Sequence, residues 1–141
     1  MEFPVRVPFV EHLGCELLSV DAAHSALRLQ PRAEHLNSHG MVHGGVLMTL
    51  LDVTMAMAAR AGRADVGVVT IEMKTTFMLP ASGPLSARGA VKVKTSNMAF
   101  VEASVFDARD RMCSHATGTF KFVHQGQHPG GGKSGAPVVT D

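Results

Sequence analysis

Residues 44–62, GGVLMTLLDVTMAMAARAG, and residues 66–79, VGVVTIEMKTTFML, decide the fold of this chain. Apolar residues dominate the first stretch, which predicts a helix from about Gly44 to Ala61 that Gly62 ends in the left-handed conformation. In the second stretch the period changes from 3.6 to 2, which indicates a strand. One face of this strand is expected to carry Val69, Ile71, Met73, Phe77 and Leu79. The other face is expected to carry Thr70, Glu72, Lys74 and Thr76.

Strand patterns flank the helix on both sides. Residues 15–20 and 24–30 predict a strand pair, preceded by a short helix that ends at Gly14. Further strands are predicted over residues 85–94, 99–107 and 111–123. This order predicts an α+β fold in which an antiparallel sheet of five to six strands wraps around one long central helix. The helix is apolar nearly all the way round, so one small sheet cannot cover it, and this indicates a partner subunit.

Length and composition narrow the class of protein. A chain of 141 residues fits one domain, and the net charge of +1 gives no basic footprint for nucleic acid. Two cysteines, Cys15 and Cys113, are too few for a disulfide framework and are expected to be free thiols. No apolar run is long enough to cross a membrane. We therefore expect a cytoplasmic protein that has neither a membrane nor a nucleic-acid partner.

The expected organisation is a leader, one domain and a tail. Residues 1–8 form the leader, and residues 9–124 form the domain. Residues 125–141 contain five glycines and two prolines, so they have little to bury and are expected to be disordered.

Asp52 is the anomaly of the helix. An ionised carboxylate on an apolar helix costs free energy unless it is paired or hydrogen-bonded, and no Lys or Arg lies within one turn of it. One interpretation is a buried aspartate satisfied by Thr49 or a backbone amide. The other is a carboxylate kept in a dry pocket because chemistry needs it there. At 100° per residue, its side of the helix is expected to hold Gly45, Met48, Thr49, Met55, Ala56 and Ala59. The opposite side is expected to hold Val46, Leu47, Leu50, Val53 and Met57.

The dipeptide Gly44-Gly45 follows His43 and begins the predicted helix. Its amides carry no side chain above them and point outward with the positive end of the helix dipole, so they could hold an oxyanion. The same glycines could equally serve close packing. Gly44 and Asp52 are eight residues apart, roughly 12 Å along the helix axis. One thioester carbonyl cannot contact both groups of the same helix, so a site that uses both must lie between two subunits.

Residues 37–45, NSHGMVHGG, followed by Asp52 and Thr70, resemble the hotdog-fold acyl-CoA thioesterases, specifically the phenylacetate-degradation subfamily. The Asn lies six residues before the His of HGG, the Asp lies nine after that His, and the hydroxyl residue lies eighteen beyond the Asp. The resemblance implies homodimers joined by sheet continuation, with two inter-subunit active sites, and homotetramers built as dimers of dimers. It implies no cofactor and no metal.

The resemblance also implies roles for individual residues in hydrolysis of an acyl-CoA. Asp52 would be the general base or nucleophile, and the amide of Gly44 the oxyanion donor. Asn37 would orient the water or the carboxylate, and His43 would fix the start of the helix or approach the thioester. Thr70 would supply a hydroxyl where relatives often have Ser. By alternation it shares a face with Glu72 and Lys74, and that face could equally be a solvated one. The acyl group is expected to contact Gly45, Met48, Met55 and Met73. Candidates for binding the CoA phosphates are Arg60, Arg63, Arg88 and Lys92.

Four other readings of these residues remain open. A hotdog dehydratase or hydratase acting on hydroxyacyl thioesters would use His43 with Asp52, and a non-catalytic module would only bind acyl-CoA. The spacing of His35, His39 and His43 would suit a metal on a helix, but the prolines and glycines around them disfavour a helix there. Cys15 beside His12 lacks a third catalytic group, and a buried structural thiol explains it better.

Overall fold

The computed structural model describes residues 1–124, and within this range the chain forms one six-stranded antiparallel sheet and one long helix. The elements are α1 (Pro8–Leu13), β1 (Glu16–Val20), β2 (His24–Leu29), η1 (Ala33–His35), α2 (Gly44–Ala59), β3 (Val66–Phe77), β4 (Leu85–Lys94), β5 (Met98–Phe106) and β6 (Met112–His124). The predicted α+β fold is confirmed. The tail predicted over 125–141 lies outside the described residues.

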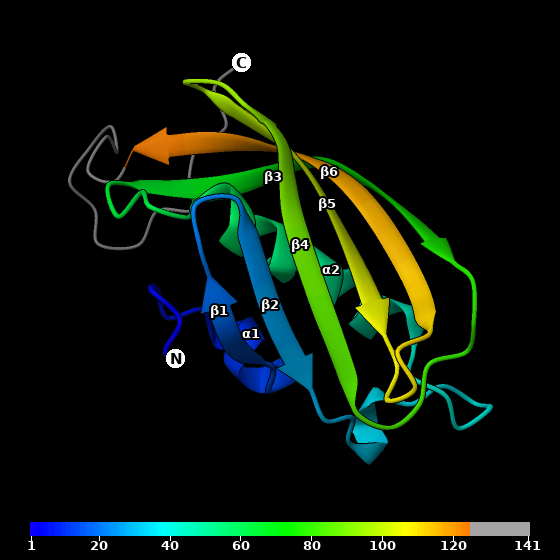
Figure 1. Ribbon diagram of the computed structural model, residues 1–141. Coiled ribbons are helices and arrows are strands. Elements are labelled where there is room, and N and C mark those ends of the chain that lie inside the picture. Colours follow the sequence, from blue (N-terminus) through cyan, green and yellow to red (C-terminus); the bar gives the residue numbers. More distant parts are fainter. Residues whose placement is uncertain (125–141) are drawn as a thin grey trace.

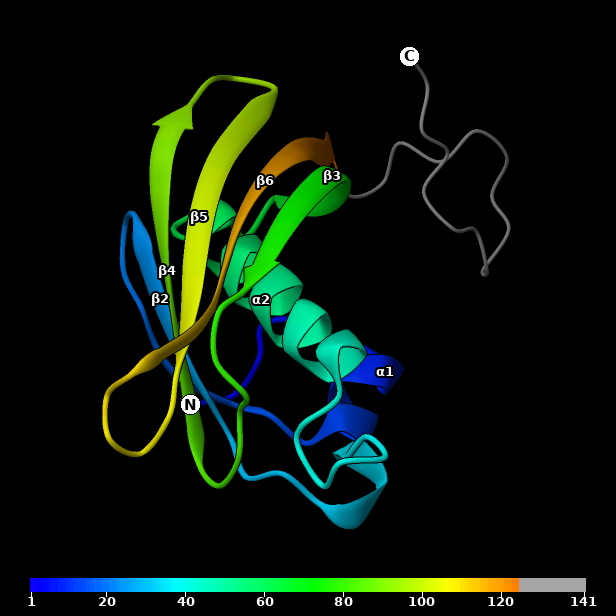
Figure 2. The ribbon, with the colours of Figure 1, turned by 90° about the vertical axis from the view of Figure 1, so that its right-hand side faces the viewer.

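The sheet curves around α2 (Figure 1). Its strand order is β1-β2-β4-β5-β6-β3, so β1 and β3 are the two edges. A view turned by 90° shows α2 against one face of the sheet, with α1 on the same side (Figure 2). Gly14 ends α1 at a φ of 79°, and Gly62 follows α2 at a φ of 75°, the left-handed conformation in which glycine is favoured. Gly62 has the predicted left-handed conformation, but α2 ends at Ala59, two residues earlier than predicted, with Arg60 as its C-cap.

Two glycines of the sheet let α2 approach closely. A Cβ added to Gly118 on β6 would lie 3.0 Å from the Met55 Cε atom. A Cβ added to Gly89 on β4 would lie 3.0 Å from the Thr54 carbonyl oxygen. The side chains that α2 buries are Leu47, Leu50, Leu51, Val53, Thr54, Met55, Ala58 and Ala59. The helix is thus held at short range on its core side, and its opposite stripe faces away from the sheet.

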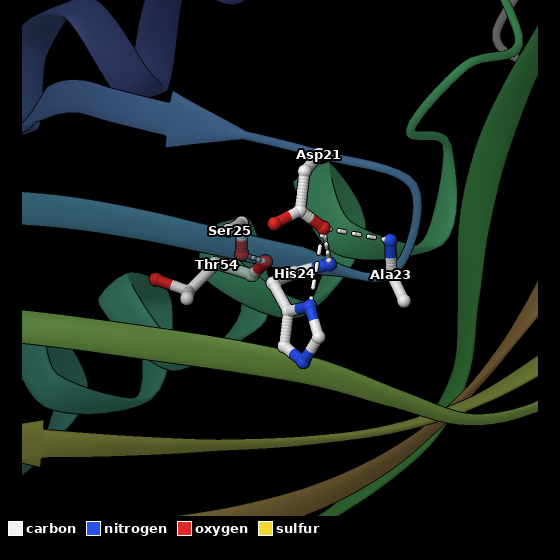
Figure 3. Close-up of polar contacts among 5 residues, drawn as sticks. All are labelled: Asp21, Ala23, His24, Ser25 and Thr54. Atoms are coloured by element: carbon white, nitrogen blue, oxygen red, sulfur yellow. Dashed lines mark hydrogen bonds and ion pairs between the residues drawn. The ribbon is translucent and has the colours of Figure 1, made fainter.

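One hydrogen bond joins the middle of α2 to β2 (Figure 3). The Ser25 hydroxyl donates to the Thr54 carbonyl oxygen at 2.6 Å, and the Thr54 hydroxyl donates to the Leu50 carbonyl oxygen at 2.6 Å. In the turn before β2, the Asp21 carboxylate accepts the amides of Ala23 and His24. Buried polar groups are costly unless they are bonded in this way. The contact at Thr54 lies two residues beyond Asp52 and sets the rotation of the helix about its axis.

The expected faces of β3 are wrong before a β-bulge between Thr70 and Glu72 and correct after it. Before the bulge, Thr70 pairs with Phe120, a core residue; after it, Met73 pairs with Gly118, also buried. A bulge adds one residue to the strand and reverses which side chains face the core. Even-numbered side chains of β3 therefore face α2 before the bulge, and odd-numbered ones face it afterwards. Ile71, at the bulge, is 46% exposed.

Candidate active site

A cleft of about 590 Å³ lies along α2 where the helix faces β3 and the N-terminal segment. Its lining residues are Phe3, Val5, Val7, Phe9, Val10, Met48, Thr49, Asp52, Val53, Ala56, Met57, Arg60, Gly67, Val68, Thr70 and Met73. Most of these side chains are apolar, and the only two charged ones are Asp52 and Arg60. The cleft therefore offers an apolar ligand a carboxylate and a guanidinium on one helix stripe.

Within residues 1–124, the half-buried Asp52 has a hydroxyl partner and no cationic one. The Thr70 hydroxyl donates to Asp52 Oδ1 at 2.6 Å. Burial raises the pKa of Asp52 above its usual value, and the hydrogen bond from Thr70 opposes that rise. Thr49 instead donates to the Gly45 carbonyl oxygen at 2.9 Å. Thr49 is therefore not the partner of this aspartate. The bulge turns the Thr70 hydroxyl towards α2, although the residue stays exposed.

The helix is rotated by roughly 60° from the orientation expected at 100° per residue. Met55 and Ala59, expected beside Asp52, are fully buried against the sheet. Val53 and Met57, expected on the opposite side, line the cleft. Asp52 therefore lies at the border of the open stripe, on the side where β3 brings Thr70. Because α2 is apolar nearly all round, its sequence could not show which stripe faces the core.

The start of α2 is a separate region from the Asp52 cleft. His43 is the N-cap: its Nδ1 accepts the Gly45 N–H at 2.8 Å. Within residues 1–124, the Gly44 N–H has no hydrogen-bond partner. The Asn37 side-chain oxygen accepts the amides of His39 and Met41 at 2.9 and 3.1 Å. These groups order the loop and leave one helix-terminal N–H free, but none of them lines the Asp52 cleft.

The residues expected to contact the acyl group also fall into two groups, one in the Asp52 cleft and one outside it. Met48 and Met73 line the cleft with Asp52, whereas Gly45 and Met55 do not. Gly45 belongs to the start of the helix, and Met55 packs in the core against β6. One protomer thus brings together Asp52, Thr70, Met48 and Met73, and it keeps Asn37, His43, Gly44 and Gly45 apart from them.

Three of the four cations proposed for CoA binding are already paired with carboxylates. Arg63 donates to Asp65 at 2.9 Å, Arg88 donates to Asp110 at 2.6 Å, and the Lys92 Nζ lies 3.0 Å from Glu102. Arg60 forms no ion pair or side-chain hydrogen bond with the rest of residues 1–124. It is also the one of the four that lines the Asp52 cleft.

The N-terminal segment is a part of the cleft that the sequence did not indicate to us. Phe3, Val5 and Val7, all within the predicted leader, line the cleft. The sequence pattern that could have indicated this is the spacing of two between these apolar residues, with Pro4 and Arg6 between them. Alternate residues of an extended chain share one face.

Two of the three histidines that were candidates for a metal site have structural partners in the chain. His35 is buried, and its Nδ1 accepts the Arg32 amide at 3.0 Å, while His43 caps α2. Within residues 1–124, no three His, Cys, Asp or Glu side chains are grouped as metal ligands would be. In the same range, no helix has the length and apolar character needed to cross a bilayer.

Known proteins of similar sequence and structure identify the fold. A protein of Saccharolobus solfataricus named as a candidate esterase is 27% identical over 109 residues, which cover 77% of this chain and 78% of that protein. The structure of a conserved protein from Pseudomonas aeruginosa superposes with a TM-score of 0.81 at 27% identity, covering 85% of this chain and 97% of the other.

The PaaI protein from the phenylacetic acid degradation operon of E. coli superposes with a TM-score of 0.76. At 20% identity over 82% of this chain and 83% of that chain, it shows a shared fold alone. The sequence pattern of the thioesterase superfamily matches residues 39–114, more than half of the chain, including α2 with Asp52 and all of β3. This chain is a member of the thioesterase superfamily.

Proposed function

We propose that this protein is an acyl-CoA thioesterase of the phenylacetate-degradation type, which hydrolyses a small aryl-CoA or a medium-chain acyl-CoA to the free acid and CoA. One observation carries the proposal. In a chain of this superfamily, Asp52 is a half-buried carboxylate with a hydroxyl donor, no cationic partner and an apolar cleft beside it. Such an environment is typical of catalytic carboxylates.

Asp52 supplies the base or the nucleophile for the reaction. As a general base it takes a proton from a water molecule whose oxygen attacks the thioester carbon. As a nucleophile it attacks that carbon itself, and water then hydrolyses the resulting anhydride. In both routes the carbon–sulfur bond breaks, and the CoA thiolate leaves and takes up a proton. A raised pKa makes the ionised form of Asp52 a stronger base, and Thr70 holds its Oδ1 in place.

A single turnover in ¹⁸O-water separates the two routes. Activated water delivers labelled oxygen to the acid product in the first turnover. Direct attack followed by hydrolysis at the aspartyl carbon delivers an unlabelled oxygen from Asp52 and leaves the label on the enzyme, where mass spectrometry of the peptide that contains Asp52 detects it.

The oxyanion donor is proposed to come from a second copy of the chain. The Gly44 N–H has no partner in residues 1–124, and it lies roughly 12 Å along the helix from Asp52. The edge strand β3 is a long strand with no neighbour beyond it among the described residues, and it exposes Ile71 and Phe77. Such an edge favours pairing with another chain. We propose a homodimer joined along β3, with two inter-subunit sites, that pairs into a homotetramer.

Gly44→Pro tests the amide itself. Proline is tolerated at the first helical position, so the substitution removes the N–H at little cost to the helix. His43 has a ψ of 139°, which suits a residue before proline. Loss of one oxyanion donor is expected to lower kcat by roughly 10²–10³-fold. Gly44→Ala is the matched control, because it meets the same Phe77 ring carbons at 3.4 Å but keeps the N–H.

Mixed dimers test whether the site is shared between subunits. Asp52→Asn and Gly44→Pro chains are each expected to be inactive, but a dimer of one of each contains one intact site. Random mixing should therefore restore about a quarter of wild-type activity, because half of the dimers are mixed and each has one of two sites. A site contained within one protomer would show no recovery.

The proposed activity is tested with a panel of acyl- and aryl-CoA esters, by following thiol release. We expect release from saturated esters that depends on Asp52. A hydratase would instead change the double bond without releasing thiol, and a binding module would bind the ester without turnover. The position of His43 as the helix cap, outside the cleft, speaks against a His43–Asp52 pair within one protomer. Cytoplasmic localisation stays a prediction.

A further inference from the structure

Arg60 gives the Asp52 cleft a second charged group. It follows the last residue of α2, two helical turns beyond Asp52, so the two residues are roughly 12 Å apart along the axis. Between them the helix presents Val53, Ala56 and Met57 to the cleft, and Val68 of β3 faces the same space. A ligand that extends from Asp52 to Arg60 therefore crosses an apolar wall and ends at a cation.

The absence of a partner for Arg60 distinguishes it from the other cations near this end of the molecule. Within residues 1–124, its side chain makes no ion pair, hydrogen bond or ring contact. Arg63, three residues later, is paired with Asp65 through two nitrogens. Glu2 and Arg63 line a neighbouring cavity of about 450 Å³ that Arg60 also borders. The Arg63 amide donates to the Arg60 carbonyl oxygen at 2.9 Å, but within residues 1–124 neither Glu2 nor Arg63 contacts the Arg60 guanidinium.

A half-buried guanidinium beside apolar side chains is poorly solvated and gains from an oxyanion that replaces the lost water. Arginine binds carboxylates and phosphates through two parallel N–H donors. We infer that Arg60 forms an anion subsite of the cleft, and that it binds a carboxylate or phosphate of the substrate at the end of the apolar wall remote from Asp52. This inference rests on the proposed thioesterase function and specifies its substrate class.

Two parts of a thioester substrate could supply the oxyanion. One is a carboxylate at the far end of the acyl group, and the other is a phosphate of CoA. Suberyl-CoA and octanoyl-CoA test the first source, because they have the same chain length and differ in the terminal carboxylate. The corresponding N-acetylcysteamine thioesters test the second source, because they contain no phosphate.

The variant is Arg60→Met, which keeps an apolar stem and removes the charge. Arg28→Met is the matched control, since Arg28 is paired with Glu16 and does not line the cleft. Circular dichroism and thermal unfolding show whether each variant is folded. Losing a hydrogen-bonded charge of this kind should lower kcat/KM for the anionic substrate by roughly 10- to 100-fold, chiefly through KM. Arg60→Lys should recover part of the loss.

The pattern of losses identifies the anion. A loss confined to suberyl esters, with or without CoA, supports the terminal carboxylate. An equal loss for both CoA esters that disappears with the N-acetylcysteamine thioesters supports the phosphate. An Arg60→Met enzyme within twofold of wild type on every substrate overturns the subsite.

A binding measurement keeps the subsite separate from the catalytic proposal. Calorimetry of suberyl-CoA with Asp52→Asn, with and without Arg60→Met, measures the anion contact without turnover. Weaker binding by the double variant supports the subsite even if the wild type hydrolyses no ester, a result that would instead refute the proposed function. Equal binding by both proteins contradicts the subsite, whatever the activity.

Discussion

Asp52 lies on α2 and Asp65 lies in the connection between α2 and β3, and the surroundings of the two carboxylates are opposite. Asp52 is half-buried and accepts one hydrogen bond from the neutral hydroxyl of Thr70, and burial raises its pKa. Asp65 is exposed and accepts two hydrogen bonds from Arg63 at 2.9 Å each, which lower its pKa to about 2. The first carboxylate is left as a base, and the second is committed to an ion pair.

The comparison shows that the surroundings of a carboxylate determine whether it can act as a base. A cation beside an aspartate stabilises its charge and weakens it as a base, whereas burial beside a hydroxyl keeps it available to accept a proton. Asp107 follows the same rule as Asp65, since hydrogen bonds from Arg111 help to lower its pKa. Each prediction below tests this contrast.

The largest effect is expected for Asp52→Asn. Removing the base should lower kcat by roughly 10²–10⁴-fold while an acyl-CoA still binds. Steady-state thiol release measures the loss, and calorimetry with a product or substrate measures the binding. Near-normal turnover by this variant would contradict the catalytic assignment.

Thr70→Val should have the next largest effect. It removes the donor to Asp52 Oδ1 and nearly preserves the volume of the side chain, so activity should fall roughly tenfold for one hydrogen bond to a charged group. Loss of that donor should also move the acid limb of the pH–rate profile to higher pH. Thr70→Ser keeps the hydroxyl and is the control; a Ser variant as impaired as Val would show that the methyl group, not the hydroxyl, matters.

The two carboxylates should change stability with pH in opposite directions. The folded-state pKa of Asp52 is raised, so folded protein binds more protons there than unfolded protein, and stability falls as pH rises from about 3.8 through the raised value. Asp52→Asn should therefore be more stable than wild type at neutral pH and lose that advantage in acid. Urea unfolding from pH 3 to pH 8 measures the difference, and a constant difference would refute the burial argument.

The smallest effect is expected for Asp65→Asn. The folded-state pKa of Asp65 is lowered, so its contribution to stability is present above pH 3.8 and is lost as the pH falls towards 2. Because the pair with Arg63 is exposed, the variant should be only slightly less stable at neutral pH. Turnover should stay within twofold of wild type. A large loss of activity would contradict the conclusion that Asp65, unlike Asp52, has no catalytic role.

The order of elements could be read from local sequence because it depends on short-range patterns. The apolar run over α2 and the alternation in β4 predict a helix and a strand without any knowledge of their neighbours. Asp52 was conspicuous for the same reason, as an isolated charge on an apolar helix. The observed bounds of the strands differ from the predicted ones by no more than a few residues, because the ends of elements are less marked than their centres.

The surroundings of Asp52 were decided by packing between segments that are distant in the chain. Thr70 reaches the carboxylate only because a bulge opposite β6 reverses the faces of β3, and the pattern of β3 alone carries no sign of it. The rotation of α2 depends on Gly89, Gly118 and Ser25, which lie in three different strands. Periodicity determines which residues form an element, but contacts with other elements determine which of its faces becomes a site, and only the tertiary structure contains those contacts.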